Sequence, residues 1–151
     1  MARQRQDQIH ALALPTRTGT LLVPSATIAE VINVPAFSPL PLAPRWIIGT
    51  VGWRSLAVPV VSFEAIMGGS PAAPMATSKV VVFYPLSGRE QFEFFAILSA
   101  GEPRPQAVDA SAMTMAPGEL PESPYIAAGL KFNGQPMWIP NLDEFKKTFY
   151  P

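Results

Sequence analysis

Residues 28–63 decide the fold, and they read IAEVINVPAFSPLPLAPRWIIGTVGWRSLAVPVVSF. The first part, Ile28 to Val34, is rich in β-branched residues and favours a strand. Pro35 to Pro44 carries four prolines in ten residues and must be an extended loop, because the residue before a proline avoids helical geometry. Trp46 to Val51 and Leu56 to Phe63 read as two more strands around a short turn. The centre of the chain therefore predicts short strands joined by turns.

The same pattern continues on both sides of this stretch. Further strands are expected at Ile9–Leu14, Thr20–Val23, Lys79–Leu86, Gln91–Leu98, Tyr125–Phe132 and Gln135–Ile139. Ser87–Glu90 and Asn133–Gly134 are typical hairpin turns, because each places a glycine in a short loop between two strands. About ten short strands and little helix indicate compact barrels.

Helix is expected at only two places. Glu64 to Met67 allows one helical turn, and Leu142 to Lys147 favours a short helix that Asn141 caps. Gly68 to Pro74 reads as a low-complexity connector between two similar halves. Gly101 to Pro124 is interrupted by prolines, so its pattern assigns no element.

The composition excludes several classes of protein. Of 151 residues, 18 are proline, which leaves no room for the long helices of an all-α bundle. There is no cysteine and a single histidine, His10, so a disulfide framework, a thiolate zinc site and a poly-histidine metal site are excluded. The 11 basic and 11 acidic residues balance, which gives no electrostatic footprint for nucleic acid. We expect neither a metal nor a cofactor.

The distribution of apolar residues points to a soluble protein with open apolar surface. No stretch approaches the roughly 20 apolar residues that span a bilayer, and the N-terminus lacks a secretory signal. We therefore expect a cytoplasmic protein without direct membrane insertion. Charged residues make up 15% of the chain and apolar residues 48%, so extensive exposed apolar surface is expected.

The central stretch resembles the corresponding part of CheW-like domains. That family typically shows a valine-x-glutamate-valine strand, a proline loop, a glycine-containing strand, an arginine-glycine turn and a proline-valine-valine strand. The matching residues here are Ile28-Ala29-Glu30-Val31, Pro39-Leu40-Pro41, Ala43 to Ile47, Gly49, Arg54 and Val58 to Val61. A weaker resemblance continues to Asn141, Leu142 and Phe145, so that it covers residues 9–147.

The resemblance implies an all-β fold of two intertwined, five-stranded SH3-like β-barrels with short helices and a hydrophobic groove between them. Residues 9–147 would form this single domain, after a disordered segment 1–8 and before a tail 148–151. The implied function is a non-catalytic adaptor that couples chemoreceptors to a CheA-type histidine kinase in receptor arrays. The implied partners are the receptor's helical signalling tip and the kinase's regulatory domain, with other CheW-like proteins as a further expectation.

Several residues depart from the family's pattern. Ser55 follows the arginine in place of glycine, Ser62 replaces an aspartate at the end of a strand, and Ser99 lies where the second barrel has an aspartate. Pro103 and Pro105 occupy a stretch that is usually more apolar. These changes indicate a divergent member, as in the auxiliary couplers of type IV pilus (twitching) systems, and they bear on the kinase contact more than on the fold.

The candidate protein-interaction residues lie in the central stretch: Ile28, Glu30, Val31, Trp53, Arg54, Leu56 and Val58. Ile28 and Val31 would build the receptor groove, or they would simply fill a barrel, as alternate residues of any half-buried strand do. Arg54 is expected to be exposed or to bridge to a carboxylate, because unpaired burial would be costly, and it would be either an interface residue or a solvated turn arginine. Trp53 would be a partly exposed hot spot or ordinary core, whereas Trp46 is expected in the core.

Two other functions are compatible with the pattern. The chain could be a small β-barrel enzyme or ligand carrier that uses the inter-barrel cleft, which predicts convergent polar groups there. It could also be a divergent paralogue that binds only one of the two partners. The carboxylates of the second half, Glu90, Glu93, Asp109, Glu119 and Glu122, are expected to be solvated, because their spacing places no two on one face of an element.

Overall fold

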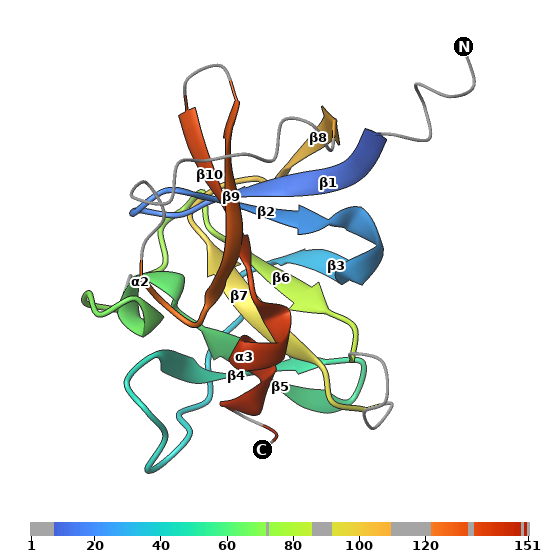
Figure 1. Ribbon diagram of the computed structural model, residues 1–151. Helices are drawn as coiled ribbons and strands as arrows, with labels where there is room; N and C mark the ends of the chain where they lie inside the picture. Colours follow the sequence, from blue (N-terminus) through green and yellow to red (C-terminus); the bar gives the residue numbers. More distant parts are fainter. Residues whose placement is uncertain are drawn as a thin grey trace.

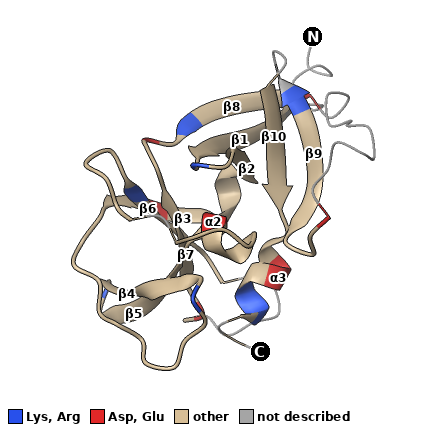
Figure 2. Ribbon diagram, turned by 90° about the vertical axis from the view of Figure 1, so that its left-hand side faces the viewer, with Lys and Arg blue, Asp and Glu red and all other residues tan. Residues whose placement is uncertain are grey.

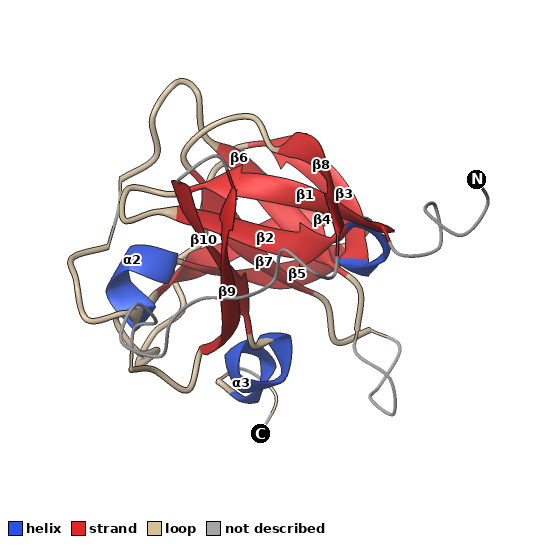
Figure 3. Ribbon diagram, turned by 45° about the horizontal axis from the view of Figure 1, so that its top comes forward, coloured by secondary structure: helices blue, strands red, loops and turns tan. Residues whose placement is uncertain are grey.

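The structure is a computed structural model, and it describes residues 8–71, 73–85, 92–109, 122–132, 135–148 and 150. Its strands are β1 (Gln8–Pro15), β2 (Thr20–Pro24), β3 (Ile28–Asn33), β4 (Ile47–Trp53), β5 (Leu56–Val61), β6 (Lys79–Phe83), β7 (Phe95–Ser99), β8 (Arg104–Asp109), β9 (Ile126–Phe132) and β10 (Gln135–Pro140). The helices are a 3₁₀ turn at Ser25–Thr27, α2 (Phe63–Ile66) and α3 (Leu142–Lys147). Strands dominate the molecule (Figure 3), so the all-β prediction is confirmed.

The ten strands form two sheets of five, each curved into a barrel (Figure 1). Barrel 1 has the strand order β8-β1-β2-β10-β9, and barrel 2 has the order β3-β6-β7-β5-β4. Both orders are built alike: an edge strand, an antiparallel pair, a parallel junction and a second antiparallel pair. The parallel junctions are β2 with β10 and β5 with β7. The two barrels are therefore repeats of one topology.

The barrels are intertwined rather than consecutive. The chain begins in barrel 1, builds all of barrel 2 from β3 to β7, and returns to complete barrel 1 with β8 to β10. The segment Gly68–Pro74 therefore joins β5 to β6 within barrel 2, and the prediction that it separates two halves is wrong. The two barrels are similar, but barrel 1 combines strands from the beginning and the end of the chain, and barrel 2 is formed by the strands between them.

A shared core lies between the two sheets. Strands of both barrels bury one face in it, through Leu14 of β1 and Leu21 of β2 on one side and Val81 of β6 and Ile97 of β7 on the other. Phe145 of α3 is also fully buried there. Because side chains alternate along a strand, the opposite faces of these strands line the barrel interiors and are buried as well. Burial on both faces explains why these strands are almost continuously apolar.

The two barrel interiors are filled differently. In barrel 2, β6 contributes Val80 and Val82, and the core also contains Trp53. In barrel 1, the equivalent strand β1 contributes Ala11 and Ala13. The smaller side chains leave barrel 1 with less apolar volume than barrel 2.

The segment from Gly101 to Pro124, to which the pattern assigned no element, contains a strand. Residues Arg104 to Asp109 form β8, which pairs with β1 and includes Pro105 opposite Leu12. Proline is tolerated here because β8 is an edge strand, where one side of the backbone needs no partner. The prolines that obscured the strand are therefore consistent with its place in the sheet.

Strand β7 starts later than its pattern predicts. The run expected from Gln91 becomes regular only at Phe95, and its partner β6 ends at Phe83 instead of Leu86. The antiparallel pairing of the two strands is confirmed. The predicted turn Ser87–Glu90 lies outside the described residues, as do Asn133–Gly134, although β9 and β10 on either side of the latter form the expected hairpin.

The C-terminal segment is anchored on barrel 2. Asn141 caps α3 as predicted, because its side chain accepts a hydrogen bond from the Glu144 amide. On the buried side of α3, the Lys146 ammonium lies 3.2 Å from the Glu93 carboxylate, and the side chains are only 4% and 12% exposed. The Tyr150 hydroxyl donates to the Phe94 carbonyl at 2.8 Å. The expectation that Glu93 is solvated is therefore wrong, because an ammonium on a distant element satisfies its charge.

Regular secondary structure runs from Gln8 to Lys147 in the described part of the chain. Strand β1 already begins at Gln8, one residue inside the segment expected to be disordered, and residues 1–7 lie outside the described part of the chain. At the other end, the hydrogen bond of Tyr150 ties part of the expected tail 148–151 to barrel 2.

Candidate protein-interaction site

Closure of barrel 2 brings its two end strands together. Strands β3 and β4 stand at opposite ends of the strand order, yet Ser38 after β3 forms a bridge with Thr50 of β4 through two hydrogen bonds of 2.8 Å. The chain passes so close here that a Cβ added at Gly49 would lie 2.6 Å from the Ser38 carbonyl oxygen. Gly49 therefore permits the closure, which gives a physical reason for its place in the pattern.

A second contact between the β3 side and the β4 side of this closure, which we call the seam of barrel 2, links Glu30, Trp53 and Arg54. The Trp53 indole Nε1 donates to Glu30 Oε1 at 3.1 Å, and Arg54 Nη2 lies 3.5 Å from the same oxygen. The Arg54 guanidinium carbon stands 4.4 Å from the centre of the Trp53 ring, a cation–π contact. The side chains of Arg54 and Glu30 are 60% and 47% exposed, whereas Trp53 is buried. We call these three residues the rim cluster.

The structure shows both environments that the sequence allowed for Arg54, because its side chain is 60% exposed and also pairs with the Glu30 carboxylate. Glu30 attracts the guanidinium of Arg54, and the ring face of Trp53 packs against it. These two contacts orient the Arg54 side chain while most of it stays in solvent. Trp53 is only 6% exposed and is part of the barrel core. Of the two environments that the sequence allowed, Trp53 therefore has that of a core residue, and it supports Arg54 through its ring face.

The turn that carries Arg54 has an unusual backbone. Arg54 and Ser55 are the two central residues of the β4–β5 hairpin and have φ angles of 48° and 64°. Two positive φ angles define the turn that matches the twist of a hairpin, and glycine or asparagine adopts them most easily. Ser55 therefore occupies a position that favours the glycine of the family's pattern. The strained turn projects Arg54 beyond the end of the sheet.

The remaining predicted site residues lie on two different faces. Leu56 pairs with Trp53 in the hairpin register and packs half-buried on the barrel 2 core, and Val58 is buried in that core. Ile28 and Val31 pack half-buried against the shared core between the barrels. The structure thus joins Glu30, Trp53, Arg54 and Leu56 at one rim, and it places Ile28 and Val31 at the margin of the inter-barrel core. Partner binding by all of them stays a prediction.

Two aromatic residues that the sequence pattern did not single out, Phe94 and Tyr84, extend the rim cluster. The Phe94 ring lies 4.8 Å from that of Trp53 and 6.2 Å from that of Tyr84. Tyr84 is 45% exposed, and Phe92, two residues before Phe94 in the chain, is 58% exposed. The run FEFF at residues 92–95 carries this signal in the sequence, but it reads as strand until the structure shows that β7 begins only at Phe95.

The serine substitutions have structural roles. Ser62 is the N-cap of α2, and its hydroxyl accepts a hydrogen bond from the Ala65 amide at 3.2 Å. Serine and aspartate are both favoured caps, so the replacement preserves this role. Ser99 is fully buried, and its hydroxyl donates to the Gly101 carbonyl at 2.7 Å. Both departures are thus compatible with the fold.

The surface carries few charges. In Figure 2 the charged positions are scattered over both barrels, in keeping with the zero net charge of the chain. Within the described residues, no group of three or more potential metal-binding side chains comes together. The helices of the described part are all too short to span a membrane.

Trp46 contributes to the shared core, as the sequence predicts, although it is only partly buried. Its indole Nε1 is inaccessible to solvent and has no hydrogen-bond partner among the residues that the structure describes. The indole thus gains apolar packing while leaving a buried donor unsatisfied.

Comparison with known proteins places this architecture in a family. No curated protein sequence matches the chain. The crystal structure of the scaffolding protein TtCheW from Thermoanaerobacter tengcongensis is similar, with a TM-score of 0.75 at 12% sequence identity over 89% of this chain and 84% of that one. The sequence model of the CheW-like domain matches residues 11–147, which includes both barrels and α3. The chain therefore belongs to the CheW-like domain family.

Proposed function

We propose that this protein is a non-catalytic adaptor that couples chemoreceptors to a CheA-type histidine kinase in a chemotaxis or twitching-motility pathway. Membership of the CheW-like family and the likeness to a scaffolding protein support an adaptor in chemotaxis. The partners would be the helical signalling tip of the receptor and the regulatory domain of the kinase. The protein would act in the cytoplasm, at membrane-associated receptor arrays.

The rim cluster is the main structural support for a protein-interaction site on this chain. Arg54 is exposed, yet Glu30 and Trp53 fix its direction, so that binding a partner costs little further ordering. Exposed Tyr84 and Phe92 supply aromatic side chains of the type enriched in interface cores. A fixed arginine beside aromatic surface is the composition expected of an interaction hot spot.

The adaptor would work by position rather than by chemistry. Two barrels around one continuous core form a rigid body, so that partners docked on it keep a fixed relative orientation. A ligand signal in the receptor would then reach the kinase as a change in geometry. The low charge of the chain favours recognition by packing over long-range electrostatic steering.

The direct test is a binding titration with two partners, a receptor signalling tip and the kinase regulatory domain from the same organism. We expect saturable binding of both by the full chain. Arg54→Ala should weaken binding to at least one partner without unfolding the protein, while Arg17→Ala, which truncates an exposed arginine in the β1–β2 turn, should bind as the unchanged chain does. If neither partner binds, the adaptor function is wrong.

The same titration separates the adaptor from a divergent paralogue. Binding of the receptor tip alone would indicate a family member that does not recruit this kinase. The partners themselves, whether from a swimming or a pilus-driven system, would identify the pathway.

A further inference from the structure

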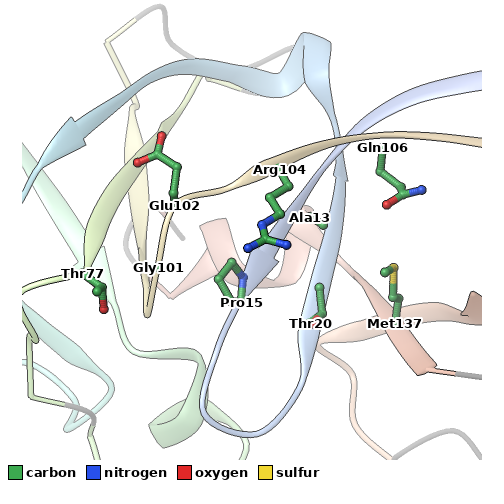
Figure 4. A pocket seen from close by; sticks show the side chains of 9 residues that line it. All are labelled: Ala13, Pro15, Thr20, Thr77, Gly101, Glu102, Arg104, Gln106 and Met137. Carbon is green, nitrogen blue, oxygen red and sulfur yellow. The ribbon is translucent and has the colours of Figure 1, made fainter.

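Barrel 1 has a cavity at its open end. The cavity has a volume of about 570 Å³, and its walls come from four strands of barrel 1, from the loop before β6 of barrel 2 and from the segment that joins β7 of barrel 2 to β8 of barrel 1 (Figure 4). The lining residues are Ala13 and Pro15 of β1, Thr20 of β2, Arg104 and Gln106 of β8, Met137 of β10, and the loop residues Thr77, Gly101 and Glu102. Mouths of β-barrels are a common place for small-molecule sites, and the volume lies in their range of about 300–1,000 Å³.

The cavity follows from the residues that face into barrel 1. Ala11 and Ala13 of β1 occupy the positions that Val80 and Val82 of β6 occupy in barrel 2. Ala13 itself lines the cavity, together with Thr20 and Met137 of the neighbouring strands, so the space that a larger side chain would fill there is open. Protein interiors are normally filled to the density of organic crystals. A barrel that leaves its mouth open therefore has room for a ligand.

The wall of the cavity combines an apolar floor with a cation. Ala13, Pro15 and Met137 form apolar surface, and Arg104 reaches from β8 toward Pro15 in Figure 4. No hydrogen bond or ion pair of the Arg104 side chain is found in the described part of the chain. Its acidic neighbour Glu102 points away from it, and the Glu102 carboxylate lies 3.6 Å from the Lys79 ammonium instead. The guanidinium is thus available to an anion.

Further polar groups frame the same space. The side chain of Gln106, also on β8, points toward Met137 across the cavity, and the hydroxyl-bearing Thr20 lies below Arg104 (Figure 4). An amide and a hydroxyl beside a guanidinium are groups that orient a carboxylate or phosphate. The arrangement places one charged end and one apolar end in a single cavity.

We propose that the mouth of barrel 1 binds a small organic anion whose charged group pairs with Arg104 and whose apolar body packs on Ala13, Pro15 and Met137. The occupant would bridge the strands of barrel 1 and the segments before β6 and after β7 of barrel 2. The site is separate from the rim cluster, because no residue lines both. The proposal does not depend on adaptor function, and each can fail without the other.

Octanoate is a suitable probe, because it joins a carboxylate to a flexible apolar chain. The full-length protein would be titrated with it while the NMR signal of the Met137 methyl group and the melting temperature are recorded. We expect saturable binding at one site, a shift of the Met137 signal and a melting temperature that rises with octanoate concentration. 1-Octanol, which keeps the chain but not the charge, and acetate, which keeps the charge but not the chain, should both bind at least about fivefold more weakly.

Two variants locate the site. Arg104→Gln should weaken octanoate binding about five- to tenfold, because it removes a charge-assisted hydrogen bond, whereas Arg17→Gln should not change the affinity. Ala13→Leu should fill the floor and abolish the Met137 shift while Arg104 is still present. The proposal is overturned if octanoate gives no saturable shift, or if it binds Arg104→Gln and Ala13→Leu as tightly as the unchanged protein.

Discussion

Barrel 1 and barrel 2 have the same strand order, but they differ in the size of the side chains that they enclose. Strand β6 of barrel 2 turns Val80 and Val82 inward, and the equivalent β1 of barrel 1 turns Ala11 and Ala13 inward. Barrel 2 is also closed along its seam by the Ser38–Thr50 bridge. One topology thus supports a filled, closed barrel and a barrel with an open mouth.

This difference shows how one fold can separate two kinds of surface. In barrel 2 the filled core supports an exposed arginine on a buried tryptophan, which is suited to a protein partner. In barrel 1 the small inward residues leave a cavity, which is suited to a small ligand. The shared core joins the two barrels without requiring their interiors to be alike.

The attachment of α3 to barrel 2 should depend strongly on the buried Lys146–Glu93 pair. Lys146→Met keeps most of the packing but removes the ammonium that faces a buried carboxylate, so we expect a loss of about 3 kcal/mol in the free energy of unfolding. Urea denaturation measures this loss. Lys147→Met is the matched control, because Lys147 is 66% exposed and pairs with Glu144 at the surface, where we expect less than about 0.5 kcal/mol. Equal effects of the two changes would contradict a stabilising role of the buried Lys146–Glu93 pair.

The stability of the two barrels should respond differently to a change in the volume of an inward-facing side chain. Val80→Ala removes two methyl groups from the filled barrel and should cost about 2 kcal/mol. Ala13→Val adds two methyl groups beside the cavity and should change stability by less than about 1 kcal/mol, because there is room for them. Denaturant midpoints at equal m-values provide the comparison. A cost of about 2 kcal/mol or more for Ala13→Val would show that the two barrels are equally filled.

The turn of the rim cluster should become more stable when its backbone strain is relieved. Ser55→Gly places glycine at a φ of 64°, and we expect a gain of about 0.5–1 kcal/mol by thermal denaturation. Ser70→Gly, in an exposed loop, is the control, and it should bring no such gain. A loss of stability in Ser55→Gly would mean that the serine side chain contributes more than the strain costs.

The smallest expected effect concerns Tyr150 at the C-terminus. Burial, and then the nearby Glu93 carboxylate, raise the pKa of its hydroxyl above the ordinary tyrosine value of about 10. The folded state therefore holds this proton more tightly than the unfolded state. Its contribution to stability is fully present below about pH 10 and declines as the pH rises from there through the raised pKa of the folded state. Tyr150→Phe should show a shallower alkaline decline in stability, and an identical decline would contradict the buried position.

Local sequence signals predict most of the fold because β-branched runs and turn glycines act over a few residues. The hairpin of β4 and β5 and the cap at Asn141 are examples. Strand β8 escapes prediction because its prolines are compatible with an edge strand only, and edge position is a property of the assembled sheet. The burial of Glu93 depends on Lys146, which is remote in sequence, so no local pattern reveals it.

Only part of the candidate site could be predicted from the sequence, because some of its contacts depend on the assembled fold. Resemblance to a family indicated Glu30 and Arg54, and the structure explains their proximity through the closure of barrel 2. The contribution of Phe94 and Tyr84 could not be read from the sequence, because it depends on where β7 begins. The cavity of barrel 1 likewise depends on which side of β1 faces inward and on what lies opposite.

The central claim is that the rim of barrel 2, and not the mouth of barrel 1, binds the protein partner. The most direct measurement is the affinity of a receptor signalling tip and of the kinase regulatory domain for the unchanged protein, for Arg54→Ala and for Arg104→Gln, each checked for folding by circular dichroism. We expect Arg54→Ala to weaken binding of at least one partner about tenfold and Arg104→Gln to change the binding of either less than about twofold. Equal affinities of all three proteins, or a loss confined to Arg104→Gln, would contradict the account.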